Sequence, residues 1–352
     1  MREKRDQSSE PEVEGNLKPG GATLADVSKL AGVSSMTVSR ALHKPEVVSK
    51  KTLEKVNWAV EQLGYIPNMM AGSLMSKRSR LVAVFVPTVA HSIFADMVQA
   101  LMHSLARKGY HTIIGVTEYS DKQEQELVEA ILGRRPDGIV LIGTQHSDLT
   151  RKRLQVSNVP VVEAWDMCDE PLDMLVGFSH EEVGRAIARH LLSKGFRRFA
   201  AISVADPRGI RRIGAMLDEL AKHEIVDVPH LYLPIPATLS TGRDGLRQLL
   251  ECNGRPEVVV CSSDTIAQGV LAEAASRGLK VPNDLAVMGF GDLSSASQVY
   301  PSLSSVRLDG QLVGETIAKV LLDRIAQKSS ATRGLRVDTG FNIIDRESTR
   351  RS

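Results

Sequence analysis

Side chains able to contact the edges of DNA bases lie close together near the N-terminus of this 352-residue chain. The stretch from Thr23 to Leu42 predicts two short helices joined by a turn at Gly32, as in a helix-turn-helix. Ser34 can cap the second helix, and Arg40 on its outer side can bond a guanine edge at two atoms. We predict that bases are read by Ser35, Met36 and Arg40, and that phosphates are held by Thr23, Ser34, Thr37 and Ser39. Two helices and a glycine turn also occur in proteins that do not bind DNA, so the motif alone does not decide the function.

A second group of polar and aromatic side chains follows predicted strands further along the chain. In parallel α/β sheets, ligands bind beyond the carboxyl ends of the strands. Carboxylate and guanidinium groups bind hydroxyls, and aromatic rings pack on the C–H face of a sugar, so a small polyhydroxylated ligand is predicted. Purely structural roles remain open for some of the candidates. Trp165 could pack in the core, Asp264 could cap a helix, and His91 could be an ordinary surface residue. The candidates are Thr88, His91, Phe94, Glu163, Trp165, Asp166, Arg208, Arg211, Ser263, Asp264 and Asp292.

The elements that must position these two groups are predicted from hydrophobic spacing. A third N-terminal helix has Ser49 as its cap and ends at Gly64. From Leu81 short apolar runs alternate with helices, which predicts parallel sheets covered on both faces. The alternation restarts near Val176, so we expect two doubly wound lobes with a cleft between them. The predicted strands are 81–86, 111–117, 139–142, 159–164, 199–203, 231–233, 258–261 and 285–288, and the predicted helices are 94–108, 122–132, 149–156, 181–192, 212–222, 241–250, 265–277 and 312–325.

Composition and charge restrict the class of protein. The chain is 42% hydrophobic with a net charge of +2, but residues 17–80 alone carry a net charge of +6, as phosphate contact requires. Cys168, Cys252 and Cys261 are widely spaced, which indicates reduced thiols and neither a disulfide framework nor a zinc site. No apolar run reaches the ~18 residues of a membrane span, and the N-terminus lacks the apolar core of a signal peptide. We therefore expect a cytoplasmic, nucleoid-associated protein with no metal and no cofactor.

Four short strings then point to one family. They are Thr-Leu-Ala-Asp-Val at 23–27, Ala-Gly-Val-Ser at 31–34, Thr-Val-Ser-Arg at 37–40 and Gly-Tyr-Ile-Pro-Asn at 64–68. In order and spacing they resemble the headpiece signature of the LacI/GalR family of bacterial transcription regulators. The resemblance implies an N-terminal all-α helix-turn-helix headpiece plus an α/β two-lobed periplasmic-binding-protein-like core of doubly wound parallel sheets, with three crossovers between the lobes.

Further residue roles are implied only by this resemblance. Leu74 aligns with the family's minor-groove wedge, and Arg211 aligns with the arginine that holds the effector. Tyr65, Asn68 and Ala71 join the DNA-binding set. The expected divisions of the chain are a disordered N-terminal extension at 1–21, a helix-turn-helix domain at 22–68, a hinge helix at 69–80, and an effector-binding and dimerisation domain at 81–352. Within the last of these, lobe 1 is expected at about 81–166 and 307–328, and lobe 2 at about 176–300 and 333–352.

The sequence departs from the common family pattern at the effector site. Ser263 stands at the position of the family's effector-binding asparagine, and Gly291 stands where an aspartate commonly binds sugar hydroxyls. A missing carboxylate suits an anionic ligand, because like charges repel. Pro-Val-Val-Glu at 160–163 and Gly-Phe-Gly-Asp at 289–292 are similar to the gluconate-type regulators of the family.

These observations together predict a repressor of sugar-acid catabolism genes. It would bind a palindromic DNA operator as a homodimer, because one recognition helix reads only a short site and symmetry doubles it. The family's tetramers have an added C-terminal heptad helix, and no heptads follow Arg346, which favours a dimer. Gluconate or a ketogluconate would release the repressor from the operator. A neutral or phosphorylated sugar remains an alternative effector. A solute-binding protein is disfavoured by the helix-turn-helix, and an α/β enzyme by the absence of GxGxxG, P-loop and GxSxG motifs.

Overall fold

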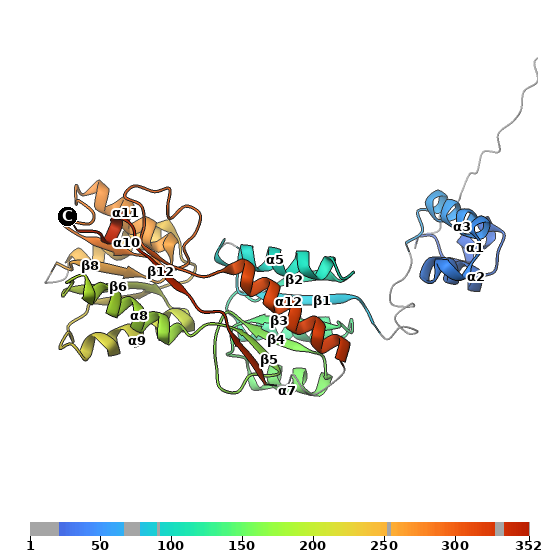
Figure 1. Cartoon of the computed structure of the whole chain (residues 1–352), viewed down its shortest axis with the longest axis horizontal. Coiled ribbons are helices and arrows are strands. Elements are labelled where there is room, and N and C mark those ends of the chain that lie inside the picture. The colour runs from blue at the N-terminus through green and yellow to red at the C-terminus, as the bar shows by residue number, and fades with distance from the viewer. Residues whose placement is uncertain (1–20, 67–77, 90–91, 252–254, 328–333, 352) are drawn as a thin grey trace, which may run out of the picture. The chain divides into compact units, whose positions relative to one another are not determined.

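The computed structural model describes residues 21–66, 78–89, 92–251, 255–327 and 334–351 (Figure 1). The chain forms two compact units that divide between Ser79 and Arg80. Most of the predicted extension and hinge helix, together with Asn68, Ala71, Leu74 and His91, lies outside the described residues.

The first unit is a three-helix headpiece whose helix ends follow from local capping. Thr23 caps the first helix in a reciprocal capping box with Asp26, and Gly32 ends it with φ 64°, a left-handed conformation that costs glycine little. Ser34 caps the second helix and Ser49 the third through side-chain acceptors. The helices are α1 (Leu24–Ala31), α2 (Ser35–His43) and α3 (Lys50–Leu63), with the 3₁₀ turn η1 (Pro45–Val47) between the last two. Their shared core includes Val27, Val38, Val56 and Ala59, all fully buried.

The second unit begins with a lobe built on a six-stranded sheet. Its neighbouring strands are parallel in the order β11-β5-β4-β3-β1-β2. Side chains alternate between faces: Val82 and Val84 pack against helices α5 and α12, while Ala83 and Phe85 pack against α6 and α7. The strands are β1 (Leu81–Val86), β2 (His111–Val116), β3 (Gly138–Ile142), β4 (Val161–Ala164), β5 (Met174–Gly177) and β11 (Leu335–Asp338). The helices are η2 (Ser92–Phe94), α5 (Ala95–Ala106), α6 (Asp121–Leu132), α7 (Asp148–Ser157) and α12 (Gly310–Gln327).

The other lobe has a four-stranded parallel sheet in the order β7-β6-β8-β9. Helices α8 and α9 cover one face, and α10 and α11 cover the other (Figure 1). The strands are β6 (Phe199–Val204), β7 (His230–Leu233), β8 (Val258–Cys261) and β9 (Ala286–Met288). The helices are α8 (His180–Ser193), α9 (Pro207–Ala221), α10 (Leu239–Glu251) and α11 (Asp264–Ser276). The expected two-lobed α/β fold is confirmed.

Three chain segments connect the lobes. The first runs from β5 to α8, the second from β9 through β10 (Ser305–Arg307) to α12, and the third from β11 through β12 (Asn342–Ile344) to the turn η4 (Glu347–Thr349). Strands β10 and β12 pair antiparallel, so the second and third segments lie side by side. One hydrophobic cluster continues through both lobes and includes Phe94, Trp165, Phe178, Ile213 and Phe290.

Two parts of the core differ from the sequence prediction. Residues 333–352 were expected in the second lobe, but β11 pairs with β5 and completes the sheet of the first lobe. Helix α9 begins at Pro207 and not at Arg212, because Asp206 caps it and proline is favoured in a first turn. The earlier start places all three arginines of this region on the helix. Among the described residues, every helix is too short or too polar to span a membrane.

Candidate functional site

The first candidate site is the outer face of α2 in the headpiece. Val38 is fully buried, which fixes the opposite face toward solvent. Met36 is 64% exposed, and Arg40, four residues later, is exposed on the same side. Ser35 and Ser39 form a neighbouring pair at the same spacing. The structure therefore brings the four predicted residues together on the side of α2 that faces solvent.

The predicted phosphate contacts at the helix starts also have structural roles. The Thr23 hydroxyl donates to Asp26 Oδ2 over 2.6 Å, and the Ser34 hydroxyl oxygen accepts from the backbone N–H of Thr37 at 3.2 Å. Tyr65 is half-buried against the headpiece core. Helix starts present unpaired N–H groups that favour an anion, so a cap and a phosphate contact are compatible at Ser34 and Thr37.

The second candidate site is a cavity between the lobes, which we name the inner cavity. Its empty volume, which includes space open to solvent, is about 600 Å³. The first lobe contributes mainly aromatic and aliphatic side chains, and the second contributes most of the charged and hydroxyl groups. The lining residues are Ile93, Phe94, Tyr119, Trp165, His180, Val204, Asp206, Arg208, Arg212, Ala237, Ser262, Ser263, Asp264, Thr265, Phe290 and Leu293. Phe94, Trp165, Arg208, Ser263 and Asp264 were predicted for this site.

A buried guanidinium group forms part of the inner cavity wall. Arg212 is 4% exposed, and its Cζ lies 3.6 Å from the centre of the Phe290 ring. Its Nη1 lies 2.7 Å from His180 Nδ1, and its Nη2 donates to the Ser262 carbonyl at 2.8 Å. Arginine has five N–H donors and these contacts use two. No carboxylate among the described residues forms an ion pair with Arg212, so this cation retains donors for a ligand.

The hydrogen bonds of His180 fix its protonation. Because arginine can only donate, His180 Nδ1 must accept, and its Nε2–H then donates to the Trp165 carbonyl at 3.2 Å. Burial lowers the pKa of His180 well below its ordinary value, and the charge of Arg212 lowers it further. Burial also lowers the pKa of Arg212, to about 10. At pH 7 the imidazole is therefore neutral and the guanidinium charged.

Arg208 is the second cation of the inner cavity. It lies four residues before Arg212 on α9, so the two side chains share a helix face. Its Nε pairs with Asp206 Oδ1 at 3.4 Å, and its Cζ lies 5.6 Å from the centre of the Phe94 ring. Its Nη1 is buried without a hydrogen-bond partner among the described residues. A buried donor in this state favours a ligand that can accept from it.

Arg211 and Asp166 line a neighbouring space and not the inner cavity. Arg211 Nη2 pairs with Asp166 Oδ2 at 2.5 Å, and its Nη1 pairs with Glu181 Oε1 at 3.2 Å. The space, which we name the outer cavity, has an empty volume of about 580 Å³, and this value includes space open to solvent. Its lining is Pro87, Thr117, Tyr119, Ser120, Asp121, Glu124, Ile142, Gly143, Thr144, Gln145, Asp166, Pro207, Arg208 and Arg211.

Glu163 does not lie in either cavity. It is fully buried on β4, where it accepts from the backbone N–H of Leu172 at 2.5 Å and lies 3.4 Å from His146 Nε2. Strand alternation explains this position, because Glu163 and its neighbours at 162 and 164 face opposite sides of the sheet. His146 also bonds Glu124 at 2.9 Å, so Glu163 belongs to a buried polar group that stabilises the first lobe.

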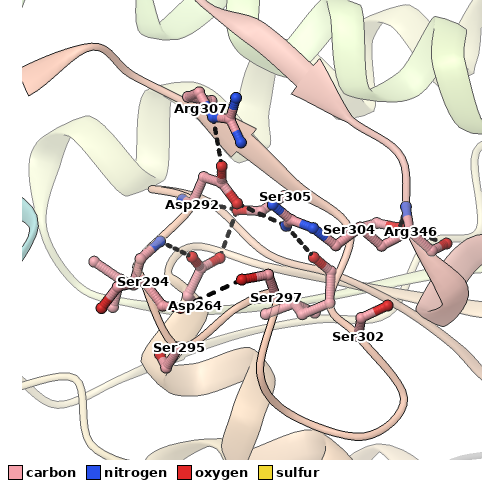
Figure 2. A network of polar contacts seen from close by, with 12 residues as sticks. Asp264, Asp292, Ser294, Ser295, Ser297, Ser302, Ser304, Ser305, Arg307 and Arg346 are labelled. Carbon is pink, nitrogen blue, oxygen red and sulfur yellow. Dashed lines mark hydrogen bonds and ion pairs between the residues drawn. The ribbon is translucent and has the colours of Figure 1, made fainter.

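Asp292 and Asp264 belong to one polar network at the lobe connections (Figure 2). Asp292 accepts from Arg307 Nε and Arg346 Nη1, both at 2.6 Å. Asp264 accepts from the Ser305 hydroxyl and from the backbone N–H of Leu293, both at 2.6 Å. Asp292 does not line the inner cavity but joins the segments around β10 and β12, and Asp264 lines the cavity as well.

The network also gives the physical reason for the glycine beside it. Gly291 has φ 120°, a conformation that L side chains rarely adopt, and a Cβ there would lie 3.0 Å from Ile93 Cδ1. The backbone therefore requires glycine at this position irrespective of the ligand's charge. Ser263 caps α11, with its hydroxyl oxygen accepting from the N–H of Ile266 at 3.3 Å. Thr88 does not line the inner cavity.

Sequence reasoning missed several residues of the inner cavity, above all Arg212, His180 and Tyr119. Arg212 had a usable signal: the Asp206-Pro207 pair marks a helix start, and the spacing from Arg208 then places both arginines on one face. His180 and Tyr119 had no such signal in the sequence, because their burial depends on the contact between the lobes. Among the described residues, no group of His, Cys, Asp and Glu side chains is arranged to hold a metal.

Comparisons with known proteins assign the chain. The family described as "Bacterial regulatory proteins, lacI family" matches residues 23–68, and the "Periplasmic binding protein-like domain" matches residues 188–349. The HTH-type transcriptional regulator GntR of Pseudomonas aeruginosa is 36% identical over 94% of this chain and 96% of the relative. The chain belongs to the lacI family of bacterial regulatory proteins.

Solved structures agree with this assignment of the LacI-family chain. A LacI-family regulator from Silicibacter pomeroyi has a TM-score of 0.87 at 29% identity, covering 94% of this chain and 100% of that one. The lac repressor dimer bound to operator and an anti-inducer has a TM-score of 0.79 at 25% identity, covering 94% and 99%. These relatives are transcription regulators and not enzymes, so the LacI-family protein is a DNA-binding transcription regulator.

Proposed function

We propose that this regulator represses sugar-acid catabolism genes and that gluconate or a ketogluconate, bound in the inner cavity, releases it from its operator. The observation that carries the proposal is Arg212, a buried guanidinium with no ionic partner among the described residues. The ligand carboxylate would pair with Arg212 and accept from the free Nη1 of Arg208. Trp165 and Phe94 would cover its carbon chain, and Ser263 and Asp264 would take hydroxyls.

The electrostatics of the empty cavity favour an anion. Burial lowers the pKa of Arg212 from 12.5 to about 10, which corresponds to a cost of about 3 kcal/mol for holding its charge. A ligand carboxylate offsets part of this cost, whereas a neutral sugar does not. The acidic side chains of the cavity have partners of their own, since Asp206 pairs with Arg208 and Asp264 accepts two hydrogen bonds.

The position of the cavity supplies a switch. A ligand changes DNA affinity only if it prefers one arrangement of the lobes. Phe94 and Trp165 belong to the first lobe, and Arg208 and Arg212 belong to the second, so a ligand that contacts all four favours one arrangement. A coupling of ~1–3 kcal/mol gives roughly 5- to 150-fold release.

The DNA half of the proposal is a homodimer on a palindromic operator. Each α2 would present Ser35, Met36, Ser39 and Arg40 to one half-site, and two half-sites double the short sequence that one helix reads. The lac repressor in the similar structure is a dimer bound to operator, which supports this arrangement. Contacts by Tyr65, Asn68, Ala71 and the wedge Leu74 remain part of the proposal. So does a cytoplasmic location with the chromosome.

Calorimetry on two adjacent arginines tests the effector assignment. Arg212→Gln should weaken gluconate binding at least about thirtyfold, because removing one partner of a buried charge pair costs about 2 kcal/mol or more. Arg211→Gln is the matched control on the same helix turn, and it should weaken binding less because Arg211 is already paired with Asp166 and Glu181.

Glucose and 6-phosphogluconate are titrated alongside, and operator binding without ligand verifies that both variants fold. Binding of glucose without gluconate would refute the sugar-acid assignment. Binding of 6-phosphogluconate alone would replace it with a phosphorylated effector. A larger loss in Arg211→Gln than in Arg212→Gln would place the carboxylate in the outer cavity.

A further inference from the structure

The space between the lobes is divided by two side chains. Tyr119 from the first lobe and Arg208 from the second are the residues that line both cavities. Arg208 Cζ lies 6.0 Å from the centre of the Tyr119 ring and 5.6 Å from that of the Phe94 ring. The guanidinium group thus lies within cation–π distance of both rings, and this attraction stabilises its position. The inner and outer cavities therefore meet at Tyr119 and Arg208, and we name these two side chains the wall.

The wall is fixed by its backbone as well as by its side chains. Tyr119 has φ 58° and Glu118 has φ 51°, so two consecutive residues are left-handed, which is uncommon for residues with a side chain. Burial raises the pKa of the Tyr119 hydroxyl above its ordinary value. Arg208 is held from its other side by Asp206, which accepts from its Nε and caps α9.

The outer cavity has the chemistry of a hydroxyl-binding space. Its arginines are already paired, Arg211 with Asp166 and Glu181, and Arg208 with Asp206. Each of these cations thus has a carboxylate partner, although Arg208 Nη1 and Arg211 Nε lack a hydrogen-bond acceptor among the described residues. An anion is therefore favoured less here than beside Arg212, which has no carboxylate partner among them. Five further polar groups of the lining are three hydroxyls, a carboxylate and an amide, which suit the hydroxyls of a sugar. These groups are Thr117, Ser120, Asp121, Thr144 and Gln145.

We infer that Tyr119 determines the length of the effector. With the wall in place, the inner cavity accepts one short acid whose carboxylate reaches Arg212. Without the Tyr119 ring the two cavities join, and the outer one receives a sugar ring attached to the acid. The ligand class excluded by the wall is therefore the aldobionic acids, in which a hexose is linked to a hexonic acid. This inference rests on the proposed sugar-acid function.

The test compares gluconate with maltobionate, a gluconate that carries a glucose ring, by calorimetry on the full-length protein. Tyr119→Gly removes the ring and suits the left-handed backbone, since glycine adopts positive φ without steric cost. Wild-type protein should prefer gluconate by at least about a hundredfold, and Tyr119→Gly should reduce this ratio at least about tenfold, which is a change of about 1.4 kcal/mol. Tyr119→Phe, which retains the ring, should keep most of the preference.

Glu118→Gly is the matched backbone control, because Glu118 is an adjacent left-handed residue that lines neither cavity. A similar fall of the ratio in Glu118→Gly would assign the effect to loop flexibility and overturn the inference. So would an unchanged ratio in Tyr119→Gly, or equal binding of both acids by wild type. Failure of the proposed function looks different: wild type would then bind neither acid.

Discussion

Asp264 provides a quantitative test of the network that joins the inner cavity to the lobe connections. Burial raises the pKa of this carboxyl from 3.8 to about 6, although hydrogen bonds from the Ser305 hydroxyl and the Leu293 N–H oppose the increase. When the pKa of a group is higher in the folded than in the unfolded protein, its contribution to folding stability is fully present below the unfolded pKa. This contribution is lost as the pH rises through the folded pKa. Here the loss falls between pH 3.8 and about 6, and the gap corresponds to about 3 kcal/mol.

Asp264→Asn removes the charge while keeping the shape. An asparagine oxygen can accept from the Leu293 N–H, and its NH₂ group can donate to Ser305 Oγ, which already accepts from the Asp292 N–H at 3.0 Å. The Ser305 hydroxyl hydrogen then loses its acceptor, at about 1 kcal/mol. We therefore expect the variant to be more stable than wild type by about 1–3 kcal/mol at pH 8, and to have no advantage near pH 4.

Urea denaturation of the ligand-free protein at intervals from pH 4 to pH 8 measures this difference. Asp292→Asn is the matched control, because Asp292 is buried in the same network but pairs with two arginines, so the same substitution there should destabilise at pH 8. A difference between Asp264→Asn and wild type that does not change with pH would refute the reasoning. So would destabilisation of Asp264→Asn at pH 8.

Other predictions concern DNA reading, coupling and the first lobe. Arg40→Ala should weaken the operator complex but hardly affect binding to random DNA, because a bidentate guanine contact gives ~1–3 kcal/mol of discrimination. Anisotropy titrations on both DNAs measure this, and equal losses of affinity on the two DNAs would make Arg40 a phosphate contact. Asp292→Asn removes the carboxylate that holds Arg307 and Arg346 at the lobe connections, so gluconate should still bind but should release less operator in a gel-shift titration. Undiminished release would exclude Asp292 from the coupling between gluconate binding and operator release. Burial alone would lower the pKa of His146, but its hydrogen bonds and the charges of two glutamates raise it to about 9. As the pH rises from 6.5 to 9, wild type should therefore lose about 3 kcal/mol of folding stability that His146→Gln does not lose. Urea denaturation measures this, and an equal pH dependence of the two proteins would contradict it.

The headpiece was predictable because its determinants are local. The caps Thr23, Ser34 and Ser49 lie within three residues of the N–H groups they satisfy, and Gly32 ends a helix through its own backbone. The strands β1 and β8 were also predicted with their observed ends, because a buried parallel strand reads as a continuous apolar run. In both cases a short window of sequence contains the relevant interactions.

The parts that sequence reasoning missed depend on distant contacts. Strand β11 is exposed along most of its length and exists because it pairs with β5, far away in the sequence. The sequence predicted a polar and aromatic site between the lobes, but it did not predict which arginines would be free for a ligand. Arg208 and Arg211 were both predicted to bind the effector, yet Arg211 pairs with Asp166 and Glu181. This pairing could not be predicted without knowing how the lobes are placed.

The late arrival of β11 and α12 has a consequence for the synthesis of this protein on the ribosome. Chains fold from the N-terminus during translation, and the headpiece is one continuous segment that can form as soon as it emerges. The first lobe cannot be completed in this way. Until residue 338 has been made, β5 presents an unpaired strand edge, and the face that Leu321 covers beside Gly138 is open to water. The nascent regulator therefore carries a folded headpiece ahead of an unfinished, aggregation-prone sheet for most of its translation, so the DNA-binding part matures long before the part that controls it.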